Sequence, residues 1–101
     1  MFKLLADYSC WPLWVREDDH DFFEPTDPAT LDLSAGLVGR LAAWRQWYES
    51  MVNIAEPSDS RVVGDAEQDA FDAEGRLLVA RVADELPRAT VWYSRDPQPK
   101  R

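Results

Sequence analysis

The sequence contains one cysteine and one histidine, and this scarcity limits the chemistry that the chain can perform. Cys10 has no partner for an internal disulfide. His20 is the only imidazole, and no spacing between it and Ser9, Ser34 or Cys10 supports a nucleophilic dyad. No other catalytic pattern is present, so we expect the chain not to be an enzyme and to need no cofactor.

Basic side chains and long apolar runs are also scarce. Eleven basic residues stand against nineteen acidic ones, which gives a net charge of −8. Such a surface repels phosphate backbones and anionic lipids, so nucleic acid and membrane are not expected partners. Charges interrupt every apolar stretch, beginning with Asp7, so neither a membrane span nor a signal peptide is predicted. These features favour a cytoplasmic protein with one domain over residues 1–94 and a flexible tail over 95–101.

The negative charge is concentrated near the start of the chain. Residues 1–34 contain eight acids and two bases, and six of these acids lie between Glu17 and Asp27. An acidic surface attracts a basic protein by steering its encounter. The same charge would also serve simply to keep the protein soluble.

Three short segments have the alternating pattern of strands. Phe2–Tyr8 alternates clearly, and Thr90–Ser94 places Val91 and Tyr93 on one face. Trp11–Val15 forms the third segment, which Pro12 would restrict to a sheet edge or a bulge. Residues 16–34 show no period and are predicted to form a long loop, which Phe22 and Phe23 fix to the core.

Two segments have helical periodicity. Leu37, Leu41, Trp44, Tyr48 and Met51 recur at helical spacing and predict a helix over 35–53, with Ser34 as its N-cap. A second stripe, which includes Gly75, predicts a helix that Asp65 caps and that ends at Leu86 before Pro87. Gly75 on the apolar stripe indicates close approach to a neighbouring element. The predicted fold is α+β, with two helices on one face of an approximately three-stranded sheet in the order β-β-α-α-β.

Five tryptophans are more than a core of this size is expected to bury. Trp44 lies on the first helical stripe, whereas Trp47 falls beside it and Trp92 lies opposite Val91 and Tyr93. Exposed aromatics close to acids are typical of a protein-binding surface, unless the loop over 16–34 covers them. The predicted partner-binding residues are Glu17, Asp18, Asp19, Asp21, Glu24, Trp14, Trp47 and Trp92.

Two alternatives to a basic protein partner remain open at the level of sequence. The cluster Asp18, Asp19, His20 and Asp21 has ligand types that suit a divalent cation, and the acidic loop 17–24 would then bind a metal or a small ligand. A homodimer through the last strand or the tryptophan-bearing face is the other alternative.

The opening Ala6–Trp14, ADYSCWPLW, resembles the start of a group of short, uncharacterised bacterial proteins. The likeness extends to an acidic loop, a helix ending in Trp44–Tyr48, the segment Phe71–Leu78 and a closing strand. It implies a single domain and brings no catalytic residues. In size, acidity and lack of a catalytic set, the chain is also similar to immunity proteins that neutralise bacterial toxins. An immunity or antitoxin-like inhibitor is therefore one form that the expected binding protein would take.

Overall fold

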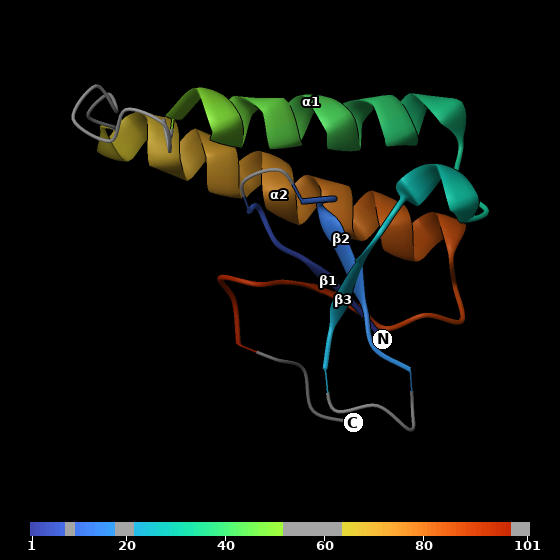
Figure 1. Ribbon diagram of the computed structural model, residues 1–101. Coiled ribbons are helices and arrows are strands. Elements are labelled where there is room, and N and C mark those ends of the chain that lie inside the picture. The colour runs from blue at the N-terminus through green and yellow to red at the C-terminus, as the bar shows by residue number, and fades with distance from the viewer. Residues whose placement is uncertain (8–9, 18–21, 52–63, 98–101) are drawn as a thin grey trace.

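The computed structural model describes residues 1–7, 10–17, 22–51 and 64–97, and in them two helices lie beside a mixed four-stranded sheet. Figure 1 shows the helices side by side, with the strands on one side of the pair. The elements in chain order are β1 (Phe2–Leu4), β2 (Leu13–Val15), β3 (Glu24–Thr26), the 3-10 turn η1 (Pro28–Thr30), α1 (Ala35–Met51), α2 (Asp65–Glu85) and β4 (Val91–Tyr93). The predicted α+β class is confirmed.

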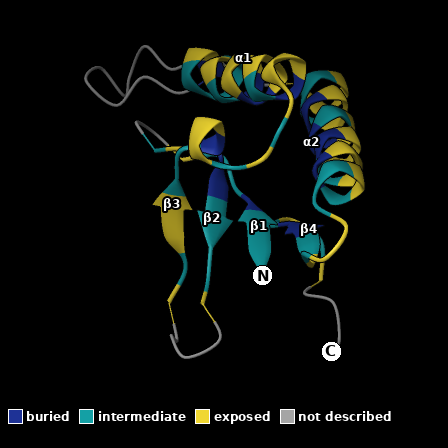
Figure 2. Ribbon diagram, turned by 90° about the vertical axis from the view of Figure 1, so that its right-hand side faces the viewer, coloured by how far each residue is buried: buried dark blue, intermediate teal, exposed yellow. Residues whose placement is uncertain are grey.

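The strand order is β3-β2-β1-β4, with β1 antiparallel to β2 and parallel to β4. The prediction of about three strands missed β3, which lies inside the segment predicted to be a loop. β3 has three residues, none of them a strong strand former except Thr26, and its central Pro25 has no amide to donate to a ladder, so the sequence pattern does not predict a strand. An edge position tolerates that missing donor, and Figure 2 shows the exposed β3 at one end of the sheet.

The second strand is internal, which corrects its expected edge position. β2 pairs with β1 on one side and with β3 on the other. Pro12 precedes the paired segment, and its carbonyl accepts a hydrogen bond from the Leu5 amide at 3.0 Å. Pro12 therefore uses its carbonyl as an acceptor, and its missing N–H removes no donor from the paired residues of β2.

Helix α1 follows its apolar stripe, and the side chains of Leu37, Leu41, Trp44 and Met51 are buried. The Ser34 hydroxyl accepts from the Leu37 amide at 3.3 Å, which confirms the predicted N-cap. The same serine donates from its own amide and hydroxyl to the two carboxylate oxygens of Glu85, at 2.5 and 2.8 Å. The end of α2 therefore anchors the start of α1. Positions 52 and 53 of the predicted helix lie outside the described residues.

Helix α2 buries the expected stripe of Phe71, Gly75, Leu78 and Val82. Its start differs by one position, because Gly64 is the N-cap and makes no side-chain bond, whereas Asp65 is the first helical residue. Asp65 and Glu67 still place negative charge in the first turn, where it favours the helix dipole. The helix ends at Glu85, with Leu86 as its C-cap.

The core joins the two helices to one face of the sheet. Leu4, Leu13 and Tyr93 belong to the same buried cluster as the helical stripes. Trp44 stacks on Phe71 with ring centroids 4.5 Å apart, and its indole N–H donates to the Phe71 carbonyl at 3.1 Å. This sheet face is therefore covered, and alternation directs Lys3, Trp14 and Trp92 to the opposite face.

Gly75 makes the close approach that the sequence predicts. A Cβ built on it would lie 2.7 Å from Tyr93 Cε1 and 3.2 Å from Trp44 Cζ2. The absence of a side chain allows both rings to pack directly on the backbone of α2. Gly75 thereby fixes the position of β4 against this helix.

Candidate partner-binding surface

The sheet face opposite the helices carries a row of aromatic and basic side chains. The register places Lys3 beside Trp14 on β2 and beside Trp92 on β4. Phe23, which immediately precedes β3, brings its ring edge-on to Trp92, with centroids 5.4 Å apart. We call Lys3, Trp14, Phe23 and Trp92 the tryptophan face.

Two cations lie against the rings of this face. The Lys3 ammonium is 4.5 Å from the centroid of Phe23 and 6.0 Å from that of Trp14. The Arg16 guanidinium is 5.4 Å from the same Phe23 ring. These cation–π contacts place two positive charges close to the Phe23 ring. The face itself is therefore aromatic and basic, although the chain as a whole is acidic.

Two of the predicted acidic residues lie at one end of the β2–β3 pair, and the register places Glu24 on the opposite side of the sheet from Trp14. Glu17 follows β2, Glu24 begins β3, and both are exposed. Val15 pairs with Glu24, so the two acids lie at the same end of the β2–β3 pair. Phe22 lies between them in sequence and is 79% exposed. Its predicted role as an anchor to the core is wrong, whereas Phe23 packs against Trp92 on the sheet face opposite the helices.

Four of the predicted site residues, Asp18, Asp19, His20 and Asp21, lie outside the described residues. The metal-binding alternative that uses them remains a prediction. Among residues 1–7, 10–17, 22–51 and 64–97, no group of three or more histidine, cysteine, aspartate or glutamate side chains is placed to hold a metal ion.

The three predicted tryptophans differ in exposure. Trp14 is half-buried, and its indole N–H donates to the Leu5 carbonyl at 3.3 Å. Trp92 is only 9% exposed, which decides between the two alternatives that the sequence left open for this residue. Phe23 covers it, as the alternative of a loop folding over this face predicted.

Trp47 lies apart from the tryptophan face, in the contact between the two helices. Its indole N–H donates to Glu67 at 3.0 Å, and its ring meets Phe71 edge-on at 5.1 Å. The side chain is half-buried and ties α1 to the first turns of α2. The structure therefore does not bring Trp47 together with Trp14.

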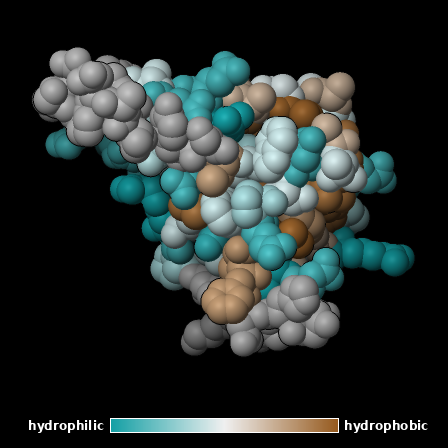
Figure 3. Space-filling view, in the orientation of Figure 1, coloured by the Kyte–Doolittle hydropathy of each residue, from teal (hydrophilic) through white to brown (hydrophobic). Residues whose placement is uncertain are grey.

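Sequence reasoning missed Trp11, which is 44% exposed and lies 5.9 Å from the Arg45 guanidinium. Strand alternation cannot be extended to Trp11, because Pro12 separates it from β2. On the face of the molecule drawn in Figure 3, hydrophilic residues alternate with patches of hydrophobic residues.

The charged residues of the segment Phe71–Leu78 form ion pairs that hold the fold together. Asp72 forms an ion pair with Arg95 at 3.0 Å, and Arg76 pairs with Asp96 at 2.8 Å. Glu74 pairs with Arg40 of α1 at 3.0 Å. Together these contacts hold α2 to α1 and to the turn after β4. Arg95 and Asp96, the first residues of the predicted tail, are part of this arrangement.

Comparison with known proteins places the chain in a family. The model of a family described as Serratia CdiI immunity protein-like matches residues 1–96. No curated protein matches the chain. No helix in the described part of the chain is long and apolar enough to cross a membrane. The matching family is not one of enzymes, in agreement with the prediction from the sequence. Because the match covers almost every residue, the chain belongs to the Serratia CdiI immunity protein-like family.

Proposed function

We propose that the protein is an immunity protein, which binds a protein toxin and blocks its activity. The match over residues 1–96 is the observation that carries this proposal. An inhibitor of this kind needs a surface that fits its partner and needs no catalytic residues of its own. The net charge of −8 favours a partner with a basic surface.

The β2–β3 end of the sheet is the surface that we propose contacts the toxin. Glu17 and Glu24 are exposed there, and Phe22, which lies between them in sequence, is exposed as well. Three further acids of the same connection, Asp18, Asp19 and Asp21, add to its charge in the sequence. The acids would steer a basic toxin and fix its orientation, because charge complementarity acts mainly on encounter and register.

Aromatic side chains would supply the apolar part of this contact. In the described part of the chain three large hydrophobic side chains are exposed, and Phe22 is the most exposed of them. Trp14 is half-buried on the neighbouring strand β2. Aromatic anchors surrounded by polar groups carry much of the energy of protein interfaces. Trp92 supports this surface from beneath Phe23, whereas Trp47 lies between the two helices and is not part of it.

A tagged form of the protein, purified from lysate of its own source cells, tests the proposal. We expect a stoichiometric basic protein at low salt that dissociates at high salt. The recovered partner should be toxic when expressed alone and harmless when the immunity protein is expressed with it. A partner whose toxicity is unchanged by co-expression would contradict the proposed function, whatever its charge.

A further inference from the structure

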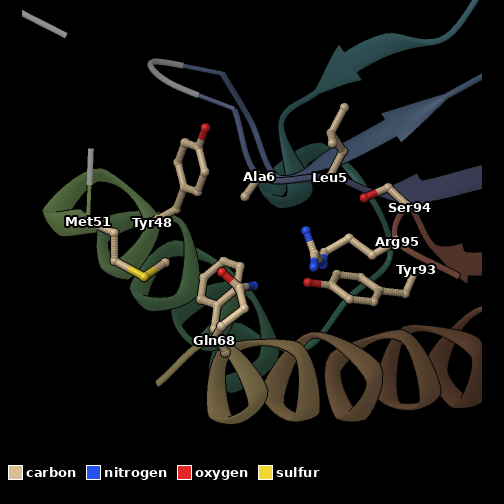
Figure 4. Close-up of a pocket in the computed structure, with 9 residues that line it drawn as sticks. Leu5, Ala6, Tyr48, Met51, Gln68, Tyr93, Ser94 and Arg95 are labelled. Atoms are coloured by element: carbon tan, nitrogen blue, oxygen red, sulfur yellow. The ribbon is translucent and has the colours of Figure 1, made fainter. Parts of the chain in front are cut away.

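A cavity of about 310 Å³ lies where both helices meet the β1–β2 connection and the end of β4. Figure 4 shows side chains from all four segments around it. Leu5, Tyr48, Met51 and Phe71 form apolar walls, whereas Gln68 and Arg95 supply polar groups. The volume is at the lower end of the range for small-molecule sites. The cavity is separate from the β2–β3 end of the sheet.

The polar side of the cavity is built on a buried carboxylate. Asp72 is 7% exposed, and its Oδ1 accepts from the Tyr93 hydroxyl at 2.6 Å and from Gln68 Nε2 at 3.2 Å. Burial and this hydrogen bond raise the pKa of Tyr93, so the fold favours the protonated phenol that donates to Asp72. Arg95 Nε lies 3.0 Å from the same Oδ1 and completes the cluster.

Arg95 directs its charge into the cavity. Its side chain extends along Tyr93 toward the middle of the cavity, with the guanidinium foremost (Figure 4). Because Asp72 meets the Nε atom, the terminal amino groups are the part of the guanidinium that reaches furthest into the cavity. The Arg95 side chain is 57% exposed, so solvent reaches the guanidinium, and the guanidinium fork matches the geometry of a carboxylate.

We propose that this cavity binds a small carboxylic acid with a compact apolar body, whose carboxylate pairs with Arg95 and whose body contacts Leu5, Tyr48 and Met51. The Asp72 carboxylate interacts with the Tyr93 hydroxyl, Gln68 Nε2 and Arg95 Nε. The terminal amino groups of Arg95 are therefore left for the carboxylate of the ligand. A cationic ligand would face the guanidinium directly and is excluded. This activity is independent of toxin binding.

Titration calorimetry of the purified full-length protein tests the proposal with phenylacetate and hexanoate as probes. We expect both acids to bind and phenethylamine not to bind. Phenylacetamide should bind at least about tenfold more weakly than phenylacetate. Arg95→Gln should weaken phenylacetate binding by at least about tenfold, a change equivalent to about 1.4 kcal/mol. Arg81→Gln removes an equal charge from the exposed surface of α2 and should leave binding unchanged.

Three results would overturn the assignment: no heat from either acid at millimolar concentration, equal binding of acid and amide, or unchanged binding by Arg95→Gln. A loss of binding in both arginine variants would show a general charge effect and would also count against the site. Circular dichroism of each variant separates lost binding from lost folding. Because the assay contains no toxin, its failure would leave the immunity function untouched.

Discussion

Replacing Gly75 with alanine should destabilise the protein, although the same change stabilises most helices. Alanine is favoured over glycine inside a helix by about 1 kcal/mol. Here, however, the new Cβ would meet Tyr93 Cε1 at 2.7 Å and Cζ at 2.9 Å. The ring cannot easily retreat, because its hydroxyl is bonded to Asp72 at 2.6 Å and its edge packs against Trp44.

The balance of these effects sets the expected magnitude. Overpacking of this kind costs about 1–3 kcal/mol, and loosening the bond between Tyr93 and Asp72 adds about 1 kcal/mol. After the helical gain is subtracted, Gly75→Ala should lower the free energy of unfolding by about 1–3 kcal/mol. Each kcal/mol corresponds to about 4–8 °C in Tm for a domain of this size.

Gly39→Ala is the matched control, because Gly39 lies within α1 and a Cβ there would meet nothing within 4 Å. It should stabilise the protein by up to about 1 kcal/mol. Urea unfolding followed by circular dichroism measures both variants. A Gly75→Ala protein that is as stable as Gly39→Ala would refute the argument that Tyr93 is held against the helix.

Two further predictions concern other aromatic side chains. Tyr93→Phe should lower the free energy of unfolding by about 1–2 kcal/mol at pH 7, because Asp72 loses a buried donor. Because folding raises the pKa of Tyr93, the unfolded tyrosine ionises first, near pH 10. The free energy of unfolding of the wild type should therefore fall above that pH. Urea titrations at pH 8 to 11 should show the difference in stability between the wild type and Tyr93→Phe becoming smaller as the pH rises. Trp92→Ala should cost about 3–5 kcal/mol because the ring is buried under Phe23, whereas Trp11→Ala should cost less than about 1 kcal/mol. Equal thermal shifts for these two variants would contradict the observed burial.

The helices could be predicted from the sequence because their periodicity is local. Leu37, Leu41 and Trp44 recur at the helical period, and this spacing is enough to predict α1. The structure buries all three side chains. Ser34 gives the start of the helix in the same local way, through a bond to an amide three residues away. Gly75 could be recognised because glycine on an apolar stripe is costly unless another element comes close.

The sheet could be predicted only in part, because short strands depend on their partners. β3 has three residues with a proline at the centre, and only its pairing with β2 makes it a strand. Trp92 lies on the face without helices, and no local pattern reveals that Phe23, far away in sequence, covers it. The polar cluster around Asp72 is equally hidden, because Tyr93 and Arg95 follow it by more than twenty residues.

The charge of the β2–β3 end gives the most direct test of the proposed inhibitor. The association rate with the recovered toxin should be measured at low salt for the wild type, for Glu17→Lys/Glu24→Lys and for a control, Asp69→Lys/Asp84→Lys. All four acids are exposed, and both double variants change the net charge equally. We predict that the Glu17/Glu24 variant associates about tenfold more slowly and that high salt abolishes the difference. Equal slowing in both variants, or none in the first, would contradict the claim that this end of the sheet binds the toxin.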